Sequence, residues 1–195
     1  MRVLYCLDIY FKKYYGTDPT RLHFLPPGIS RDRIAPQNAS EVAQDKRTEL
    51  GIPKDNQLVL MVGSGFIKKG LDRALLAIKS LPDTTRAKTS FCIVGEDNNA
   101  PFMRQAARLG IRDNVMFLSG RDDIPQLMQA ADILLHPALD ENAGIVLLEA
   151  IVAGLPVLAT DICGYGHYVV EADVGALVSS LFDQNELNKK LLLLM

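Results

Sequence analysis

Short apolar runs alternate with amphipathic stretches through most of the chain. Five runs are apolar throughout, which is typical of strands buried on both faces of a sheet. These predicted strands are residues 58–62, 91–94, 115–118, 133–135 and 157–159. Between and around them, apolar residues recur at three- and four-residue steps, which predicts helices at residues 71–81, 102–111, 124–131 and 146–152. This alternation predicts an α/β fold with a doubly wound, Rossmann-like and mostly parallel sheet.

The segments outside this alternation are less regular. Pro82 ends the first predicted helix, and Gly154 followed by Pro156 predicts a glycine cap after the fourth. Residues 38–55 are polar and are interpreted as a helix and a loop, and residues 10–30 as a helix end, a turn and a short strand. The final "LNKKLLLLM" reads as an apolar helix that needs a packing partner, so we expect a fragment of a longer protein.

Composition narrows the class of protein. The 195 residues carry 21 basic and 23 acidic side chains, a balance that does not support a general nucleic-acid binder. Cys6, Cys92 and Cys163 lie far apart without a C-x-x-C pair, so neither a disulfide framework nor a zinc site is predicted. No apolar run reaches the roughly 18 residues of a membrane span, and no signal-peptide pattern is present.

The turn at the end of the first predicted strand is a candidate phosphate cradle, because ligands bind at the carboxyl ends of strands in such sheets. In "VGSGFIKKGLDR", Gly63, Gly65 and Gly70 let a ligand approach the backbone closely. Lys68 and Lys69 precede a helix whose N-terminus favours an anion. The turn matches neither G-x-G-x-x-G nor the P-loop pattern, and the alternative is a solvated basic loop.

Two further turns carry weaker signals. "VGEDNN", at residues 94–99, is either the edge of a ligand site or a simple turn. In "LSGRDDIPQLM", Arg121 is a candidate for contacting a base or a phosphate. Asp122 or Asp123 is interpreted as the N-cap of the next helix.

Two carboxylates bracket the turn before the fourth predicted helix. In "DENAGIVLLEAIVAGLPVLAT", Glu141 is expected on the loop and Glu149, eight positions later, inside the helix. Asn142, Ala143 and Gly144 would then present backbone N–H groups to an anion. Ionised carboxylates accept strong hydrogen bonds from sugar hydroxyls, so acids near phosphate-binding lysines indicate a nucleotide sugar. The alternative is a helix N-terminal acid beside an unrelated surface acid.

Two histidines near these turns are also considered. His136 follows a buried strand and is interpreted as structural. His167 lies in the glycine-rich "CGYGHY", where a structural role and a ligand contact are about equally supported.

Together these motifs resemble those of the retaining glycosyltransferases of the GT-B fold, family 4 type. The stretch beginning "DENAGIVLLEA" resembles their E-x7-E motif, "GSGFIKKG" their diphosphate loop, and "GRDDIPQLMQAADILLHPA" the segment before the motif. "LPPGI" resembles their interdomain P-N-G-V turn, with Pro27 in place of Asn. The resemblance covers about residues 24–178 in the family's order. Within the family, "KGLDR", "AGIVLLEA" and "CGYGHY" resemble most the enzymes that add glucose to the lipopolysaccharide core.

The resemblance implies roles for the motif residues. Glu149 would bind the ribose hydroxyls of UDP, and Glu141 would bind hydroxyls of the glucose. Lys69, with Lys68, would neutralise the diphosphate as it leaves, which makes Lys69 and Glu141 the expected catalytic pair. The backbone positions expected at the phosphate and sugar are Gly63, Asn142, Ala143, Gly144 and Ile145.

Two positions are compared with the family's residues, Arg121 in the third turn and Ser64 in the first. Arg121 falls in the loop that contacts uracil, where the family uses main chain more than side chain. The family's Arg after the first Gly of the diphosphate loop is replaced here by Ser64. Lys68 can supply a charge in its place, but not the bidentate fork of a guanidinium.

The resemblance also implies a domain organisation. GT-B enzymes place their reaction between two doubly wound domains. Residues 31–195 correspond to the nucleotide-sugar domain and residues 1–30 to a remnant of the interdomain segment and first strand region. The N-terminal acceptor domain would be absent, so we expect weak binding of UDP or UDP-glucose and little or no turnover.

The implied reaction is transfer of glucose from UDP-glucose to a heptose of the lipopolysaccharide inner core, with retention at the anomeric carbon. No metal or cofactor beyond the donor is expected, and no nucleic acid. The acceptor would be a lipid-linked oligosaccharide, in the cytoplasm or peripherally on the cytoplasmic face of the inner membrane. Alternatives are another nucleotide-sugar transferase, a sugar-nucleotide epimerase, a stand-alone donor domain with a separate acceptor subunit, or a non-catalytic nucleotide-binding module.

Overall fold

The computed structural model describes residues 11–23 and 28–195. The strands of the described residues form one six-stranded sheet in the order β3-β2-β1-β4-β5-β6, and every neighbouring pair is parallel. The predicted doubly wound parallel sheet is therefore confirmed. The strand order reverses between β1 and β4, so the loops that follow these two strands meet at a topological switch point.

All five predicted strands are present, with ends that differ by at most two residues. The strands are β1 (Gln57–Val62), β2 (Thr89–Val94), β3 (Val115–Leu118), β4 (Ile133–His136), β5 (Val157–Thr160) and β6 (Gly175–Val178). The helices are α2 (Ala39–Glu49), α3 (Leu71–Ser80), α4 (Asp83–Arg86), α5 (Ala100–Leu109), α6 (Ile124–Ala130), α7 (Ile145–Val152), α8 (Gly166–Glu171) and α9 (Gln184–Leu194). Three short 3-10 turns are η1 (Pro19–Arg21), η2 (Arg31–Arg33) and η3 (Arg112–Asn114).

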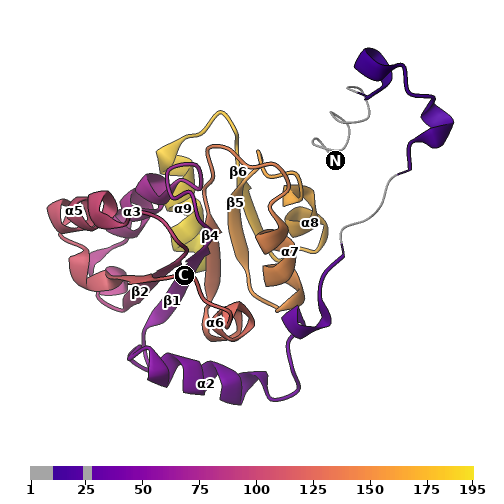
Figure 1. Ribbon diagram of the computed structural model, residues 1–195. Helices are drawn as coiled ribbons and strands as arrows, with labels where there is room; N and C mark the ends of the chain where they lie inside the picture. The colour runs from indigo at the N-terminus through magenta and orange to yellow at the C-terminus, as the bar shows by residue number, and fades with distance from the viewer. Residues whose placement is uncertain (1–10, 24–27) are drawn as a thin grey trace.

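Helices cover both faces of the sheet (Figure 1). On one face, side chains of α3, α5 and α9 pack with Val59 and Met61 of β1. On the other face, α6, α7 and α8 pack with Leu58 and Leu60 of the same strand. Alternate residues of β1 thus enter opposite cores, which is why its centre is apolar without interruption.

The C-terminal apolar helix finds its partner within the described residues. Leu187 and Leu191 of α9 are fully buried in the core on the α3 side of the sheet. Leu193 points away from this core and is largely exposed. The expected glycine cap of α7 is also present, because Gly154 has a left-handed φ of 76° just after the helix.

The structure adds elements that the sequence pattern did not predict. The edge strand β6 is four residues long, and α8 begins inside the glycine-rich "CGYGHY" stretch. Residues 11–15 are helical, but residues 11–23 and 28–30 contain no strand, so the short strand expected there is absent from the described part. Residues 25–27 of "LPPGI" lie outside the described residues.

None of the helices within residues 11–23 and 28–195 has the length and apolar character needed to cross a membrane.

The pairing of β5 with β6 requires a glycine at position 175. A Cβ atom there would lie 1.9 Å from the carbonyl oxygen of Val157, and the φ of Gly175 is +154°. We expect Gly175→Ala to lower the free energy of unfolding by about 2–4 kcal/mol, because the clash is with backbone that cannot move aside. Gly28→Ala is the matched control, since its added Cβ meets no atom of the described residues within 4 Å. Urea unfolding followed by circular dichroism measures both, and equal midpoints would contradict this account.

Candidate functional site

Two loops meet at the switch point and define the candidate site. The first, residues 63–70, connects β1 to α3, and the second, residues 137–144, connects β4 to α7. The backbone N–H groups of Leu139 and Asp140 both donate to the carbonyl of Lys68, at 2.8 and 3.2 Å. Gly70 allows this approach, because a Cβ at this position would lie 2.0 Å from the carbonyl oxygen of Pro137. The two loops therefore form one continuous rim.

The first loop is supported from the neighbouring strand. Asp97, after β2, accepts a hydrogen bond from the backbone N–H of Phe66 at 2.8 Å. Ser64 accepts from the backbone N–H of Glu96 at 3.0 Å, so its hydroxyl links the same two loops. The Phe66 ring packs on Phe102 with centroids 5.9 Å apart. "VGEDNN" thus forms a turn that supports the first loop, and its interpretation as the edge of a ligand site stays a prediction.

The centre of the site is a carboxylate shared by two other side chains. Glu141 Oε2 accepts from Lys69 Nζ and lies 3.1 Å from His136 Nε2, while Glu141 Oε1 accepts from the backbone N–H of Asn142 at 3.1 Å. The three side chains are mostly buried, with exposed fractions of 21% for Lys69, 12% for Glu141 and 0% for His136. The structure therefore brings the predicted pair Lys69 and Glu141 into direct contact.

This contact sets the ionisation of Glu141. Burial of the carboxyl group works to raise its pKa, but the hydrogen bonds from His136 and Lys69, together with the charge of Lys69, outweigh burial and lower the pKa to about 2. Glu141 is therefore an acceptor across the neutral pH range. Because a carboxylate can only accept, the proton shared with His136 belongs to His136 Nε2.

His136, interpreted from the sequence as structural, is the third side chain of this cluster. It is the last residue of β4, so its side chain lies at the same sheet edge as the loop that carries Glu141. Its Nδ1 atom is buried and has no hydrogen-bond partner among the described residues. Its position in the sequence could have indicated this contact, because it lies one residue past the predicted end of a buried strand and five residues before Glu141.

The N-terminus of α7 lies beside this cluster. Gly144 caps the helix in a left-handed conformation, with φ 75° and ψ 50°. Asn142 has its N–H engaged by Glu141, but the N–H groups of Ala143, Gly144 and Ile145 have no acceptor among the described residues. These three donors and the helix dipole favour an anion at this position.

Glu149 lies inside α7, as predicted, but it is not free of protein partners. Its Oε1 atom is 3.4 Å from Nε of Arg33, a residue of η2 that no sequence motif singled out. Glu149 and Arg33 are 19% and 25% exposed. No ion pair connects Glu149 with the Lys69 cluster among the described residues.

Arg121 is bound by two carboxylates of the protein. Its Nε atom donates to Asp123 at 2.6 Å, and its Nη2 atom lies 2.9 Å from Glu49 of α2. The hydrogen bond to Asp123 is the main cause of a raised Arg121 pKa. The guanidinium thus binds carboxylates of the protein, one of them on α2. Main-chain contact with a base remains the prediction for this loop.

The interpretation of Asp123 as a helix cap is wrong for its side chain. Asp123 occupies the N-cap position of α6 but makes no capping hydrogen bond. It accepts instead from Arg121 and, at 2.7 Å, from Lys46 of α2. The hydrogen bond from Arg121 is the main reason that the pKa of Asp123 is held well below its usual value.

Two other predicted residues are placed more loosely. Lys68 Nζ lies 3.5 Å from Asp140, and both side chains are exposed, so this pair contributes little by itself. His167 Nδ1 is 3.1 Å from the carbonyl oxygen of Gly164 within the turn before α8, and its ring lies 4.2 Å from that of Tyr168. Among residues 11–23 and 28–195, no group of His, Cys, Asp and Glu is arranged to hold a metal ion.

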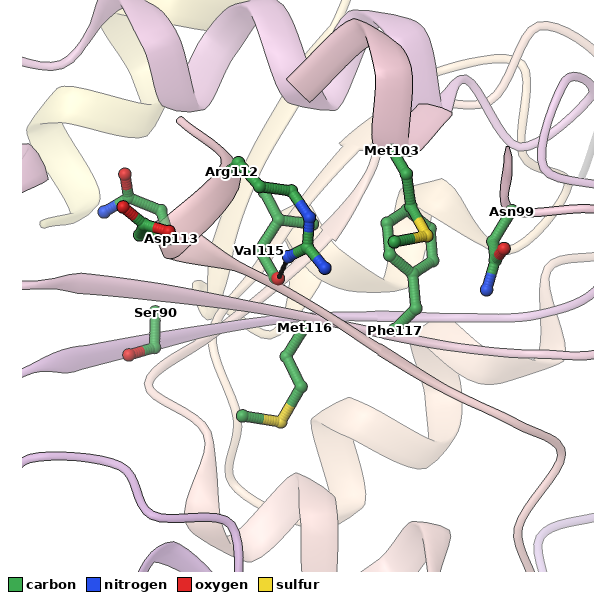
Figure 2. Close-up of a pocket in the computed structure, with 9 residues that line it drawn as sticks. Ser90, Asn99, Met103, Arg112, Asp113, Val115, Met116 and Phe117 are labelled. Carbon is green, nitrogen blue, oxygen red and sulfur yellow. Dashed lines mark hydrogen bonds between the residues drawn. The ribbon is translucent and has the colours of Figure 1, made fainter. Parts of the chain in front are cut away.

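A hollow of about 340 Å³ lies elsewhere, beside the edge strand β3 (Figure 2). Met116 and Phe117 of β3 and Met103 of α5 line it, and Arg112 donates to the carbonyl oxygen of Val115 at 3.0 Å across one end. It contains none of the predicted site residues. The candidate site is thus a rim along the carboxyl ends of β1 and β4.

The family model described as glycosyl transferases group 1 matches residues 42–195. The chain belongs to this family. Its members in the comparison include the lipopolysaccharide glucosyltransferase WaaG of Escherichia coli K12, which is 48% identical over 181 residues. That match covers 93% of this chain and 48% of WaaG, so the chain spans about half the length of this curated relative.

Solved structures of glycosyltransferases agree with this family. The crystal structure of WaaG superposes with a TM-score of 0.87 and 47% identity, covering 94% of this chain and 50% of WaaG. The Anabaena protein HepE, solved in complex with UDP and glucose, superposes with a TM-score of 0.74 and 26% identity, covering 89% of this chain and 48% of HepE. The resemblance to GT-B glycosyltransferases, and to WaaG in particular, is thus confirmed.

The lowered pKa of Glu141 predicts a pH-dependent contribution to stability. The pKa of Glu141 in the folded chain, about 2, lies below the ordinary glutamate value of 4.5, so the stabilisation is fully present above about pH 4.5 and is lost as the pH falls towards 2. We expect Glu141→Gln to lower the free energy of unfolding by on the order of 2 kcal/mol at pH 7 and by progressively less below pH 4.5.

Urea unfolding at several pH values between 3 and 7 measures this difference. Glu171→Gln is the control, because Glu171 is exposed at the end of α8 and has no ion pair within the described part of the chain. If the difference in free energy of unfolding between wild type and Glu141→Gln stays constant down to pH 3, the lowered pKa of Glu141 is contradicted.

Proposed function

We propose that this chain is the donor-binding half of a retaining glycosyltransferase that transfers glucose from UDP-glucose to a heptose of the lipopolysaccharide inner core. One observation supports the proposal above all: an ionised Glu141, shared by Lys69 and His136, lies beside three N–H groups at the start of α7 that have no acceptor among the described residues. Such a rim offers acceptors for sugar hydroxyls and donors for phosphate side by side.

The diphosphate would be bound by Lys69 and the N-terminus of α7. Cleavage of the bond between glucose and phosphate leaves negative charge on UDP and positive charge on the sugar. An ammonium group and helix N–H groups aimed at the diphosphate stabilise that charge without a metal ion. The Lys69 side chain passes over Gly63, where an added Cβ would be 3.5 Å from Lys69 Cε, so the loop leaves room for this lysine.

Donor binding would give Lys69 a second anionic partner. In the structure its ammonium contacts Glu141 Oε2, which also interacts with His136. When the diphosphate attracts Lys69, His136 still donates to Glu141 and keeps the carboxylate in place. Glu141 is then available to accept hydrogen bonds from glucose hydroxyls, while Glu149 accepts from the ribose.

The relatives support the choice of donor and reaction. WaaG, which is 48% identical, is named a lipopolysaccharide glucosyltransferase, and HepE was crystallised with UDP and glucose and with UDP-glucose. Because the chain spans about half of these proteins, the acceptor contacts would come from another half of such an enzyme. The lipid-linked acceptor, a cytoplasmic location and peripheral association with the inner membrane belong to this proposal.

The nucleotide is the first part of the donor to test. We expect UDP to bind this chain, and Lys69→Ala and Glu149→Ala each to weaken binding roughly 10- to 100-fold, because each removes a charged hydrogen-bonding partner. Lys79→Ala is the control, since Lys79 is exposed in the last turn of α3. Isothermal titration calorimetry measures the affinities, with EDTA present to test that no metal is needed. No binding of UDP, or equal affinities for all variants, would defeat the proposal.

Recognition of the glucose is tested by a variant that should leave the affinity for UDP unchanged. We expect Glu141→Gln to lower the affinity for UDP-glucose roughly tenfold or more relative to the affinity for UDP, because the carboxylate accepts hydrogen bonds from the sugar. Titrations with UDP-N-acetylglucosamine and GDP-mannose should give weaker binding than UDP-glucose. Tighter binding of either would indicate another nucleotide-sugar transferase. If glucose adds no affinity to UDP in any variant, the chain is a nucleotide-binding module.

A further inference from the structure

Arg33 occupies a position at the candidate site that no sequence motif indicated. It belongs to η2, more than 20 residues before β1 in the chain, yet its Nε atom lies 3.4 Å from Oε1 of Glu149. The backbone holds it there, because the N–H group of Ala35 donates to the carbonyl of Val152, the last residue of α7, at 3.4 Å. The segment before the sheet is thus attached to the helix that carries Glu149.

The ion pair leaves both Glu149 and Arg33 with hydrogen-bonding atoms that have no partner among the described residues. Glu149 Oε2 has no hydrogen-bond or ion-pair partner among the described residues, whereas Oε1 faces Arg33. Arg33 has its other carboxylate neighbour, Asp32, at 3.8 Å, and its Nη1 atom is buried without a partner in the described part of the chain. A carboxylate held at one oxygen and open at the other is oriented to accept from a ligand hydroxyl.

We propose that Arg33 is a positioning residue for ribose recognition: by holding Glu149 Oε1, it keeps the Glu149 carboxylate turned so that it accepts from the ribose diol of the donor. This inference rests on the proposed function, in which Glu149 binds the ribose. Arg33 itself touches no part of the donor in this scheme. Its effect is transmitted through one carboxylate.

The physical reason is the cost of leaving a mostly buried carboxylate without a partner. Glu149 is 19% exposed, so removal of Arg33 would leave a charge that is poorly solvated and a side chain with several rotamers to choose from. Arg33 reaches Glu149 through its Nε atom, and the planar guanidinium fixes the direction of that N–H group, which a rotating ammonium does not reproduce. Arg33 should therefore contribute specifically to the hydrogen bonds that Glu149 makes with hydroxyls.

The test compares UDP with 2′,3′-dideoxy-UDP, which lacks both hydroxyls of the diol. The ratio of their affinities for the 195-residue chain, measured by calorimetry, isolates the contact with the ribose. We expect the ratio to fall roughly tenfold or more in Glu149→Gln and roughly three- to tenfold in Arg33→Gln. Arg33→Lys should recover part of the ratio, and the double variant should resemble Glu149→Gln within about twofold.

Arg31→Gln is the matched control, because Arg31 lies in the same 3-10 turn, is exposed and has no ion pair among the described residues. It should leave the ratio unchanged. One outcome is that Arg33→Gln weakens the binding of UDP and of dideoxy-UDP equally while Glu149→Gln abolishes the preference for UDP over dideoxy-UDP. In that case the role of Arg33 is overturned and the proposed function stands. If Glu149→Gln also leaves the ratio unchanged, the proposed function fails and this inference fails with it.

Discussion

The contact of Glu141 with Lys69 and His136 is the interaction on which the candidate site depends. A mostly buried carboxylate or ammonium is stable only when it is paired, so Lys69 and Glu141 each account for the presence of the other. Lys69 follows β1, His136 ends β4, and Glu141 lies on the loop after it. The cluster exists because the reversal of strand order makes β1 and β4 neighbours.

Backbone packing holds the two loops at the distance that this cluster requires. Gly70 passes against Pro137 so closely that no other residue fits there without displacement, and the carbonyl of Lys68 accepts two N–H groups of the opposite loop. Asp97, which belongs to a third loop, fixes the first loop from the other side. A site built in this way is organised before a ligand arrives, which lowers the entropy cost of binding.

The segment before the sheet also serves the rim. Arg33 of η2 faces Glu149, while Glu49 and Lys46 of α2 bind Arg121 and Asp123 after β3. Helix α2 has an exposed and polar surface, and these charged contacts, rather than a large apolar face, help attach it beside α6. The surroundings of Glu149, Arg121 and Asp123 are thus arranged by residues that precede the sheet in the chain.

The sequence by itself determined the sheet, because strands buried on both faces must be apolar throughout, and five of them could be located to within two residues. It also placed Lys69 and Glu141 at strand-to-helix turns, where parallel sheets bind ligands, and Glu149 inside the helix that follows the second of these turns. It could not reveal β6, a four-residue edge strand, the ion pairs of Arg33 and Arg121, or the hydrogen bond between His136 and Glu141. Those depend on which segments meet in space. Periodicity reports which face of an element is buried, whereas the tertiary structure alone decides which charge lies opposite another.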